Sequence, residues 1–197
     1  MSATTNADIS SRGRAAARAL RSADTDLRDA ALQAIATELE QNAVAILAAN
    51  AEDIAAAVES NTAASLVDRL TLNDERLAAL AQSVRDVAAL PDPVGRIVED
   101  RRLHNGLELS KICVPIGRVL VVYESRPNVT IDVAALCIKS GNVALLRGSA
   151  AAAQSNAVLG DAIRAGLTAV GLPADVVISI EGSRDDLGLL VADASTA

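Results

Sequence analysis

Two polar segments each follow a short apolar run near the middle of the chain, and both carry residues that suit anion binding. The first, residues 124–128, contains Arg126, whose guanidinium can donate paired hydrogen bonds to a phosphate or a carboxylate. The second, residues 147–149, places Gly148 after Arg147, and a glycine lets the backbone approach a ligand closely. A solvated loop arginine is an equally good interpretation of Arg126 from the sequence alone.

The elements that carry these segments repeat the order strand, loop, helix over residues 115–156. Apolar runs at residues 119–122 and 143–146 predict two strands, and residues 176–180 predict a third. Helical segments lie between them, so the strands should form a parallel sheet. Ligands of such sheets bind beyond the carboxyl ends of the strands, and both polar segments lie there. A sheet of three strands is also expected to leave an exposed edge.

Residues 9–90 show helical periodicity. One apolar stripe precedes an expected break at residues 41–42, and it consists of Leu27, Ala31, Leu32, Ile35 and Leu39. A second stripe is expected at Val44, Leu47, Ala51, Ile54 and Val58. Asn73 is the predicted N-cap of a further helix, whose apolar face is Leu77, Leu80, Val84 and Val87. Pro91 should end that helix, because proline cannot continue it.

A boundary is expected at residues 91–95, which contain two prolines and a glycine. Beyond it, Asn105 and Gly106 are typical of a tight hairpin turn. The flanking residues 96–103 and 107–114 are therefore predicted to pair as antiparallel strands.

The composition of the chain argues against several classes of binding partner. The 197-residue chain has a net charge of −7, one tyrosine and no phenylalanine or tryptophan, which argues against binding of nucleic acids or anionic membranes. Two cysteines make neither a disulfide framework nor a metal cluster, so no metal site is expected. No apolar run approaches ~20 residues, and residues 1–11 lack the apolar core of a signal peptide. A soluble, cytoplasmic protein is expected.

Seven motifs together resemble one family, gamma-glutamyl phosphate reductase (glutamate-5-semialdehyde dehydrogenase), of the aldehyde dehydrogenase superfamily. Among them, ESRPNVT at residues 124–130 followed by KSGN at residues 139–142 is highly specific to this branch. The complete set, in family order and spacing, is residues 68–72, 90–95, 105–107, 114–117, 123–130, 136–142 and 146–148.

The resemblance implies an aldehyde-dehydrogenase-like α/β fold with a partial Rossmann-like parallel sheet. Residues 1–95 would form helices of the cofactor domain, and residues 96–114 a ribbon through which the protein forms a homo-oligomer. Residues 115–197 would begin the NADP-binding domain, and the catalytic domain would be absent from this chain.

The implied reaction is the NADPH-dependent reduction of L-glutamyl 5-phosphate to L-glutamate 5-semialdehyde with release of phosphate, a step of proline biosynthesis. In this reaction a cysteine thiolate attacks the acyl phosphate, and hydride from NADPH reduces the thioester. Two alternatives remain open: another aldehyde or acyl-phosphate dehydrogenase of the superfamily, and a non-catalytic cofactor-binding or assembly module of the same fold.

The resemblance assigns roles to the first polar segment. Asn128 aligns with the asparagine whose amide stabilises the oxyanion of the intermediate. Without the family, its position favours a helix N-cap. Ser125, Arg126 and Pro127 would pass the nicotinamide side of the cofactor, largely through backbone atoms.

In the second segment, Arg147, Gly148 and Ser149 would lie near the adenosine ribose, where an arginine suits the 2′-phosphate of NADP. The sequence departs from the family here. Ser149 replaces a common glycine, and Ala151 stands where a glutamate is usual. Loss of that carboxylate removes repulsion toward a 2′-phosphate, but it also removes an acceptor for a ribose hydroxyl.

The remaining reactive side chains have structural interpretations. Cys137 lies in an apolar segment and Cys113 in a predicted strand, and neither matches the family's catalytic cysteine, so the chain alone is expected to be inactive. His104 precedes the hairpin turn without a partner for catalysis. Lys139 should end its helix beside the negative end of the dipole.

Overall fold

A computed structural model describes residues 6–180 of the chain. Its α-helices are α1 (Asn6–Arg21), α2 (Thr25–Gln41), α3 (Ala43–Glu59), α4 (Ala64–Leu70), α5 (Asp74–Ala89), α6 (Pro127–Lys139) and α7 (Ala153–Ala169). The strands are β1 (Ile97–Arg102), β2 (Glu108–Ile112), β3 (Arg118–Val122), β4 (Val143–Arg147) and β5 (Val177–Ser179). Short 3₁₀ turns precede α7 (η1, Ala150–Ala152) and β5 (η2, Ala174–Val176).

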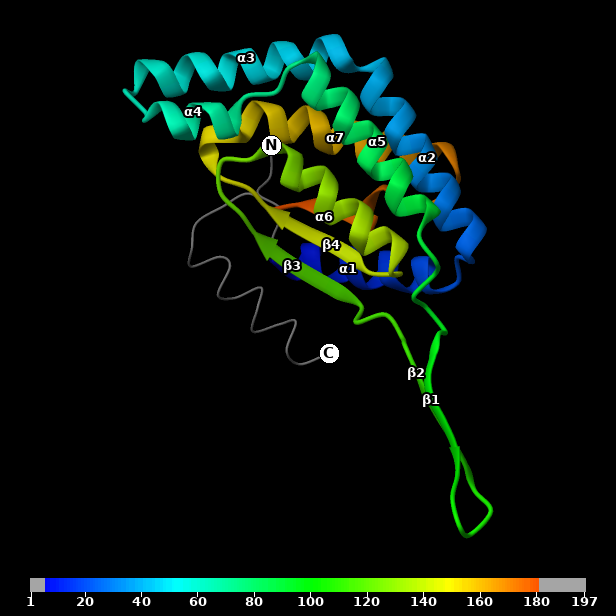
Figure 1. The fold of residues 1–197 in the computed structure, drawn as a ribbon. Coiled ribbons are helices and arrows are strands. Elements are labelled where there is room, and N and C mark those ends of the chain that lie inside the picture. Colours follow the sequence, from blue (N-terminus) through cyan, green and yellow to red (C-terminus); the bar gives the residue numbers. More distant parts are fainter. Residues whose placement is uncertain (1–5, 181–197) are drawn as a thin grey trace.

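The three predicted strands form a parallel sheet, and their order is β3-β4-β5. The middle strand β4 is buried over residues 143–146, since helices cover both faces: α6 and α7 lie on one side and α1 on the other (Figure 1). Among the described residues β3 lies at one edge of this sheet, and Val122 on it is 57% exposed. The part of the predicted cofactor domain beyond residue 180 lies outside the described residues.

A second layer of helices packs on α6 and α7. The stripe on α2 is confirmed, since Leu32, Ile35 and Leu39 are almost completely buried. Helix α7 approaches α2 so closely that a Cβ at Gly166 would lie 2.8 Å from Cα of Ile35. Glycine is required at this crossing.

The stripe predicted for α3 is wrong in part, since only Leu47 and Ile54 of its five residues pack against the core. Val44 is 84% exposed and Val58 60% exposed, and the buried face instead consists of Ile46, Asn50, Asp53 and Ala57. The polar residues on this face have hydrogen-bond partners in distant segments, which offset the cost of burying them. Apolar periodicity does not identify the buried side of this helix, because two of its buried residues are polar.

Helix α5 agrees with its prediction. Asn73 Oδ1 accepts from the Arg76 amide at 2.8 Å, which makes it the N-cap, and the helix ends at Ala89, before the proline.

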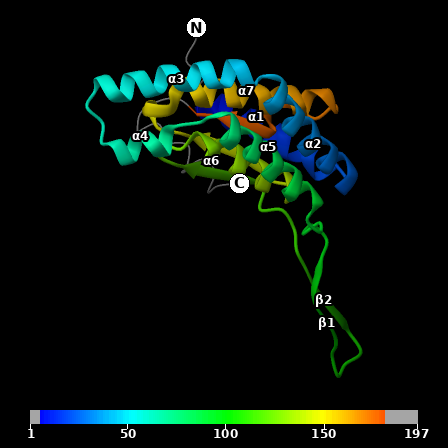
Figure 2. The same cartoon turned by 45° about the horizontal axis from the view of Figure 1, so that its top comes forward.

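The predicted ribbon is confirmed as an antiparallel pair, β1 and β2, which projects away from the body of the molecule (Figures 1 and 2). Gly106 has a φ of +88° in the turn, a conformation that glycine adopts without strain. Every residue of both strands is exposed.

Hydrogen bonds and an ion pair of Asp92 connect the segment before β1 with helix α2. The Asp92 carboxylate accepts from the Val94 amide at 2.9 Å and from the Thr25 hydroxyl at 2.5 Å, and it pairs with the buried Arg28. The Lys139 ammonium, also buried, donates to Asp29 nearby. No helix among residues 6–180 is long and apolar enough to cross a membrane.

Candidate functional site

The two polar segments adjoin at the carboxyl edge of the sheet. Val122 and Arg147 are partners in the parallel ladder, and the Tyr123 amide donates to the Arg147 carbonyl at 3.1 Å. The structure thus brings the ends of β3 and β4 together, although 24 residues separate Tyr123 from Arg147 in sequence (147 − 123).

Helix α6 begins two residues earlier than an Asn128 cap would require. Pro127 is its first residue and Arg126 occupies the N-cap position without a side-chain capping bond. The interpretation of Asn128 as the N-cap is therefore wrong. The cause is Pro127, whose fixed φ suits the first helical position. The Asn128 side chain is free of capping and donates instead from Nδ2 to Asp132 Oδ2 at 3.2 Å.

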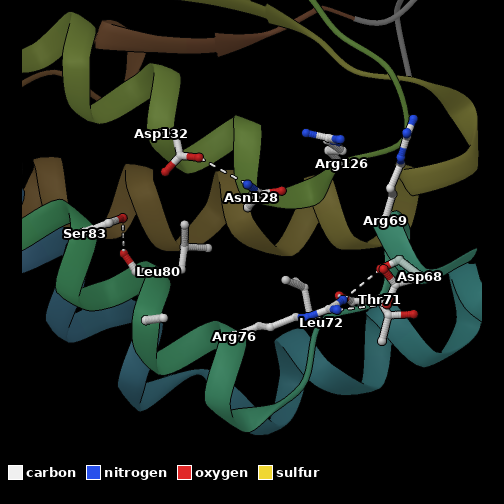
Figure 3. A pocket seen from close by; sticks show the side chains of 11 residues that line it. Asp68, Arg69, Thr71, Leu72, Arg76, Leu80, Ser83, Arg126, Asn128 and Asp132 are labelled. Carbon is white, nitrogen blue, oxygen red and sulfur yellow. Dashed lines mark hydrogen bonds and ion pairs between the residues drawn. The ribbon is translucent and has the colours of Figure 1, made fainter. Parts of the chain in front are cut away.

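A hollow of about 420 Å³ lies between the segment from α4 to α5 and the start of α6; we name it the α5–α6 hollow (Figure 3). Its polar lining on α6 and its N-cap is Arg126, Asn128 and Asp132. The opposite wall contributes further side chains, among them Asp68, Arg69, Arg76 and Ser83. Asp68 and Arg69, which belong to one of the family motifs, thus line the same hollow as Arg126.

The arginines that line this hollow differ in whether they form hydrogen bonds and ion pairs within the protein. Arg76 is held by Asp68, whose Oδ1 lies 2.9 Å from Nη2, and by the carbonyl of Thr71 at 2.8 Å. Arg69 and Arg126 are exposed, and neither forms an ion pair with another of the described residues. Two guanidinium groups are therefore available to an anion.

Asp132 is half-buried. Burial raises the pKa of its carboxyl group, against the opposing effect of hydrogen bonds from Asn128 and Ser83. As long as it is ionised, this carboxylate can only accept hydrogen bonds, so it holds the nitrogen of the Asn128 amide toward itself.

A second hollow of about 300 Å³ lies between the end of β4 and the start of α7; we name it the β4–α7 hollow. It is lined by the predicted cofactor residues Arg147, Gly148 and Ser149, together with Tyr123 and Asn156. A Cβ at Gly148 would overlap the Asn156 amide and would lie 3.2 Å from the Tyr123 ring. The absence of a side chain at Gly148 is thus required by the packing around this turn.

Thr130 on α6 forms hydrogen bonds with two residues that line the β4–α7 hollow. Its hydroxyl lies 2.7 Å from the Tyr123 hydroxyl and 2.7 Å from Asn156 Oδ1. Burial raises the pKa of Tyr123, so the phenol stays neutral and can donate to Thr130. Neither Thr130 nor Asn156 was predicted to be a site residue. Only Thr130 could have been found from the sequence, because it lies within the ESRPNVT motif.

A buried polar network supports the start of α7. Asp53 Oδ2 accepts from the Ser155 amide at 2.8 Å and from its hydroxyl at 2.6 Å. Asn50 Nδ2 donates to Ser155 Oγ at 3.0 Å and to the Leu70 carbonyl at 2.9 Å. The network connects α3 with α7 and with the segment next to Arg69, so it touches the walls of both hollows.

The structure therefore divides the predicted site residues. Arg126 and Asn128 line the α5–α6 hollow, and Arg147, Gly148 and Ser149 line the β4–α7 hollow. Ser125 is half-buried and Pro127 is buried, and neither is among the lining residues of these two hollows.

The other reactive side chains lie apart from both hollows. Cys137 is buried, and burial raises its pKa to about 11, which agrees with an inert thiol. Cys113 is half-buried, and His104 is exposed in the hairpin turn. Residues 6–180 contain no group of three or more histidine, cysteine or acidic side chains able to hold a metal ion.

Comparison with family models finds no match, but individual proteins match strongly. The chain is 51% identical over 181 residues to the gamma-glutamyl phosphate reductase of Kineococcus radiotolerans, covering 91% of this chain and 42% of that protein. It is 50% identical over 188 residues to the enzyme of the same name from Sorangium cellulosum, covering 90% and 44%. The chain thus spans less than half the length of these relatives.

Solved structures give the same result. The crystal structure of gamma-glutamyl phosphate reductase from Thermotoga maritima superposes with a TM-score of 0.87 at 38% identity, over 93% of this chain and 44% of that one. The enzyme from Saccharomyces cerevisiae gives 0.87 at 34% identity, over 94% and 48%. A benzaldehyde dehydrogenase from Corynebacterium glutamicum, at 19% identity and a TM-score of 0.65, shares the fold. The aldehyde-dehydrogenase-like α/β fold is confirmed.

Proposed function

We propose that this chain, which is homologous to part of gamma-glutamyl phosphate reductase, forms the cofactor-binding and oxyanion-stabilising portion of an NADPH-dependent reductase of L-glutamyl 5-phosphate. The observation that carries the proposal is the meeting of the Asn128 segment and the Arg147 segment at one edge of the parallel sheet. Sheets of this kind bind their ligands at that edge.

Asn128 would act as the oxyanion donor. Its amide nitrogen carries two hydrogens, of which one is directed to Asp132. The second is available to an oxygen that develops negative charge in the α5–α6 hollow. A donor held in place before the reaction costs no reorganisation when that charge forms.

The β4–α7 hollow would hold the adenosine end of NADP. Its volume of about 300 Å³ is at the lower end of the range for small-molecule sites. The guanidinium of Arg147 suits a 2′-phosphate, and the backbone of Gly148 and Ser149 would lie beside the ribose. When bound, the cofactor supplies the hydride; this part of the chain binds and orients it.

Neither cysteine is placed to be the nucleophile. Cys137 is buried with a raised pKa, and Cys113 follows the ribbon, outside the residues that line either hollow. We therefore expect the 197 residues to bind cofactor without turning over substrate.

The exposed ribbon would mediate homo-oligomer formation. Ile97, Leu107 and Ile112 are each at least half exposed on it, and such apolar edges are typical of association sites. The oligomeric state of the purified chain, compared with that of an Ile97→Lys, Ile112→Lys variant, tests this part of the proposal.

Titration of the purified chain with NADPH and NADH, followed by nicotinamide fluorescence, tests the cofactor assignment. We expect saturable binding, with a higher affinity for NADPH than for NADH. In the Arg147→Gln variant the ratio of the two affinities should fall about tenfold. Arg102→Gln, which removes a charge from the remote ribbon, is the matched control. Equal binding of the two nucleotides would contradict NADP specificity. A complete lack of saturable binding would favour the assembly-module alternative.

A further inference from the structure

We propose that the α5–α6 hollow recognises both charged ends of its substrate, with Arg69 and Arg126 binding the phosphate and Asp132 binding the α-ammonium group. This inference rests on the proposed function, since it concerns the same reaction, but it assigns substrate contacts that cofactor binding does not require. Asn128 lies between the two ends.

The order of these groups follows from the helix. Arg126 occupies the N-cap position of α6, and Asn128 is the second residue of this helix. Asp132 lies one turn further along. All three line one hollow, and Figure 3 shows Asn128 between Arg126 and Asp132. A ligand that extends along this wall meets a cation, then an amide donor, then a carboxylate.

The cationic end is built from two separate segments. Arg69 and Arg126 line the same hollow from different segments of the chain (Figure 3), and neither has an acidic partner among the described residues. Arg76 is different, because Asp68 and two backbone carbonyls already occupy its donors. Two unpaired guanidinium groups repel each other, and a dianion bound between them would relieve that repulsion.

The acidic end is the half-buried carboxylate of Asp132, which accepts a hydrogen bond from the neutral Asn128. It forms no ion pair with another of the described residues, and burial of its charge is unfavourable without a cation. An ammonium group in the hollow would supply the missing positive charge.

L-Glutamyl 5-phosphate carries its groups in the matching order: phosphate, reacting carbonyl, short methylene chain, ammonium-bearing carbon. With the phosphate at the arginines and the ammonium at Asp132, the carbonyl oxygen falls next to Asn128, where the oxyanion develops. The leaving phosphate would then depart from the exposed end of the hollow.

Two stable phosphonates test the assignment on the purified chain by calorimetric titration. L-α-Amino-ω-phosphonohexanoate keeps the number of atoms between the ammonium-bearing carbon and phosphorus, and ω-phosphonohexanoate lacks only the amino group. Both retain the carboxylate, so their difference reports on the ammonium alone. We expect the amino compound to bind about tenfold more tightly, as for a charged hydrogen-bonded pair.

Variants then locate the two contacts. Asp132→Asn should abolish the preference for the amino compound while leaving the affinity for ω-phosphonohexanoate unchanged or higher. Arg126→Gln and Arg69→Gln should each weaken both compounds by about tenfold. The control for Asp132 is Asp86→Asn, because Asp86 accepts the same type of i to i+4 amide bond, from Gln82 at 2.8 Å, on the exposed side of α5. Arg102→Gln is the control for the arginines.

Absence of phosphonate binding by a chain that still binds NADPH would overturn this inference and leave the proposed function standing. Equal affinity for the two phosphonates, or a preference that survives Asp132→Asn, would overturn the ammonium assignment. Loss of NADPH binding by the unmodified chain would instead contradict the proposed function.

Discussion

Asn128 donates a hydrogen bond to Asp132 one turn further along α6, with 3.2 Å between Nδ2 and Oδ2. This single contact decides which end of the amide faces the carboxylate, because an ionised carboxylate accepts and cannot donate. It also explains why Asn128 does not cap its helix. The side chain is committed to a neighbour within α6, and Pro127 has already taken the first helical position.

Asp132→Asn should stabilise the protein near neutral pH and have less effect in acid. Burial raises the pKa of Asp132 in the folded state, so folding of the wild type is favoured as the pH falls through that value, and the ionised form costs stability above it. Asparagine has no charge to bury. Thermal unfolding of both proteins over a pH series measures the difference, with Asp86→Asn as control. A gain that stays constant down to a pH well below the usual aspartate pKa would contradict this explanation.

Asp53→Ala should destabilise the chain by about 3 kcal/mol, because the substitution leaves buried donors at the start of α7 without an acceptor. The Ser155 amide and hydroxyl and the Gln154 amide lose their shared partner. Urea unfolding measures the change, and Glu52→Ala, an exposed neighbour on the same helix, should have an effect within about 0.5 kcal/mol. Equal effects of the two substitutions would mean that the network contributes little.

Asp29→Asn should cost about 3 kcal/mol, because it removes the carboxylate that lies 2.6 Å from the buried Lys139 ammonium. Lys139→Met should cost less, since Asp29 is only half-buried and water can reach it once the lysine is gone. Asp26→Asn, in the first turn of the same helix, controls for the helix dipole. Chemical denaturation measures the free energy of unfolding of the three variants. A larger loss of stability in Lys139→Met than in Asp29→Asn would contradict this prediction.

Alkylation should distinguish the two cysteines. Burial raises the pKa of Cys137 to about 11, so little thiolate exists in mildly alkaline buffer and the side chain is shielded from reagent. Iodoacetamide should therefore label Cys113 first in the native chain and both cysteines in urea. Peptide mass spectrometry of timed samples reads the order, and prior labelling of Cys137 in the native chain would show that it is reactive after all.

Much of the fold was predictable because its signals are local. Apolar runs of four residues, the glycine at position 106 and the proline at position 91 each restrict the backbone of their own neighbourhood. The parallel sheet, the hairpin, the Asn73 cap and the buried face of α2 all follow from such patterns and agree with the structure.

The site was predictable only in part. Its residues at the strand ends follow from the sheet topology and from the family motifs, and the structure brings those strand ends together. The partners of these residues follow from neither. Arg69 and Arg126 line the same hollow because α5 packs against α6, and their separation of 57 positions in the sequence (126 − 69) hides this relationship from any local pattern.

The sequence by itself therefore determined the elements, their order and the location of the polar segments. Tertiary structure decided which face of α3 is buried and how the site divides into two hollows, because both depend on segments that are distant in the sequence. Burial of Asn50 and Asp53 is favourable only when Leu70 and Ser155 supply hydrogen bonds from distant parts of the chain, and such partners exist only after the helices have packed.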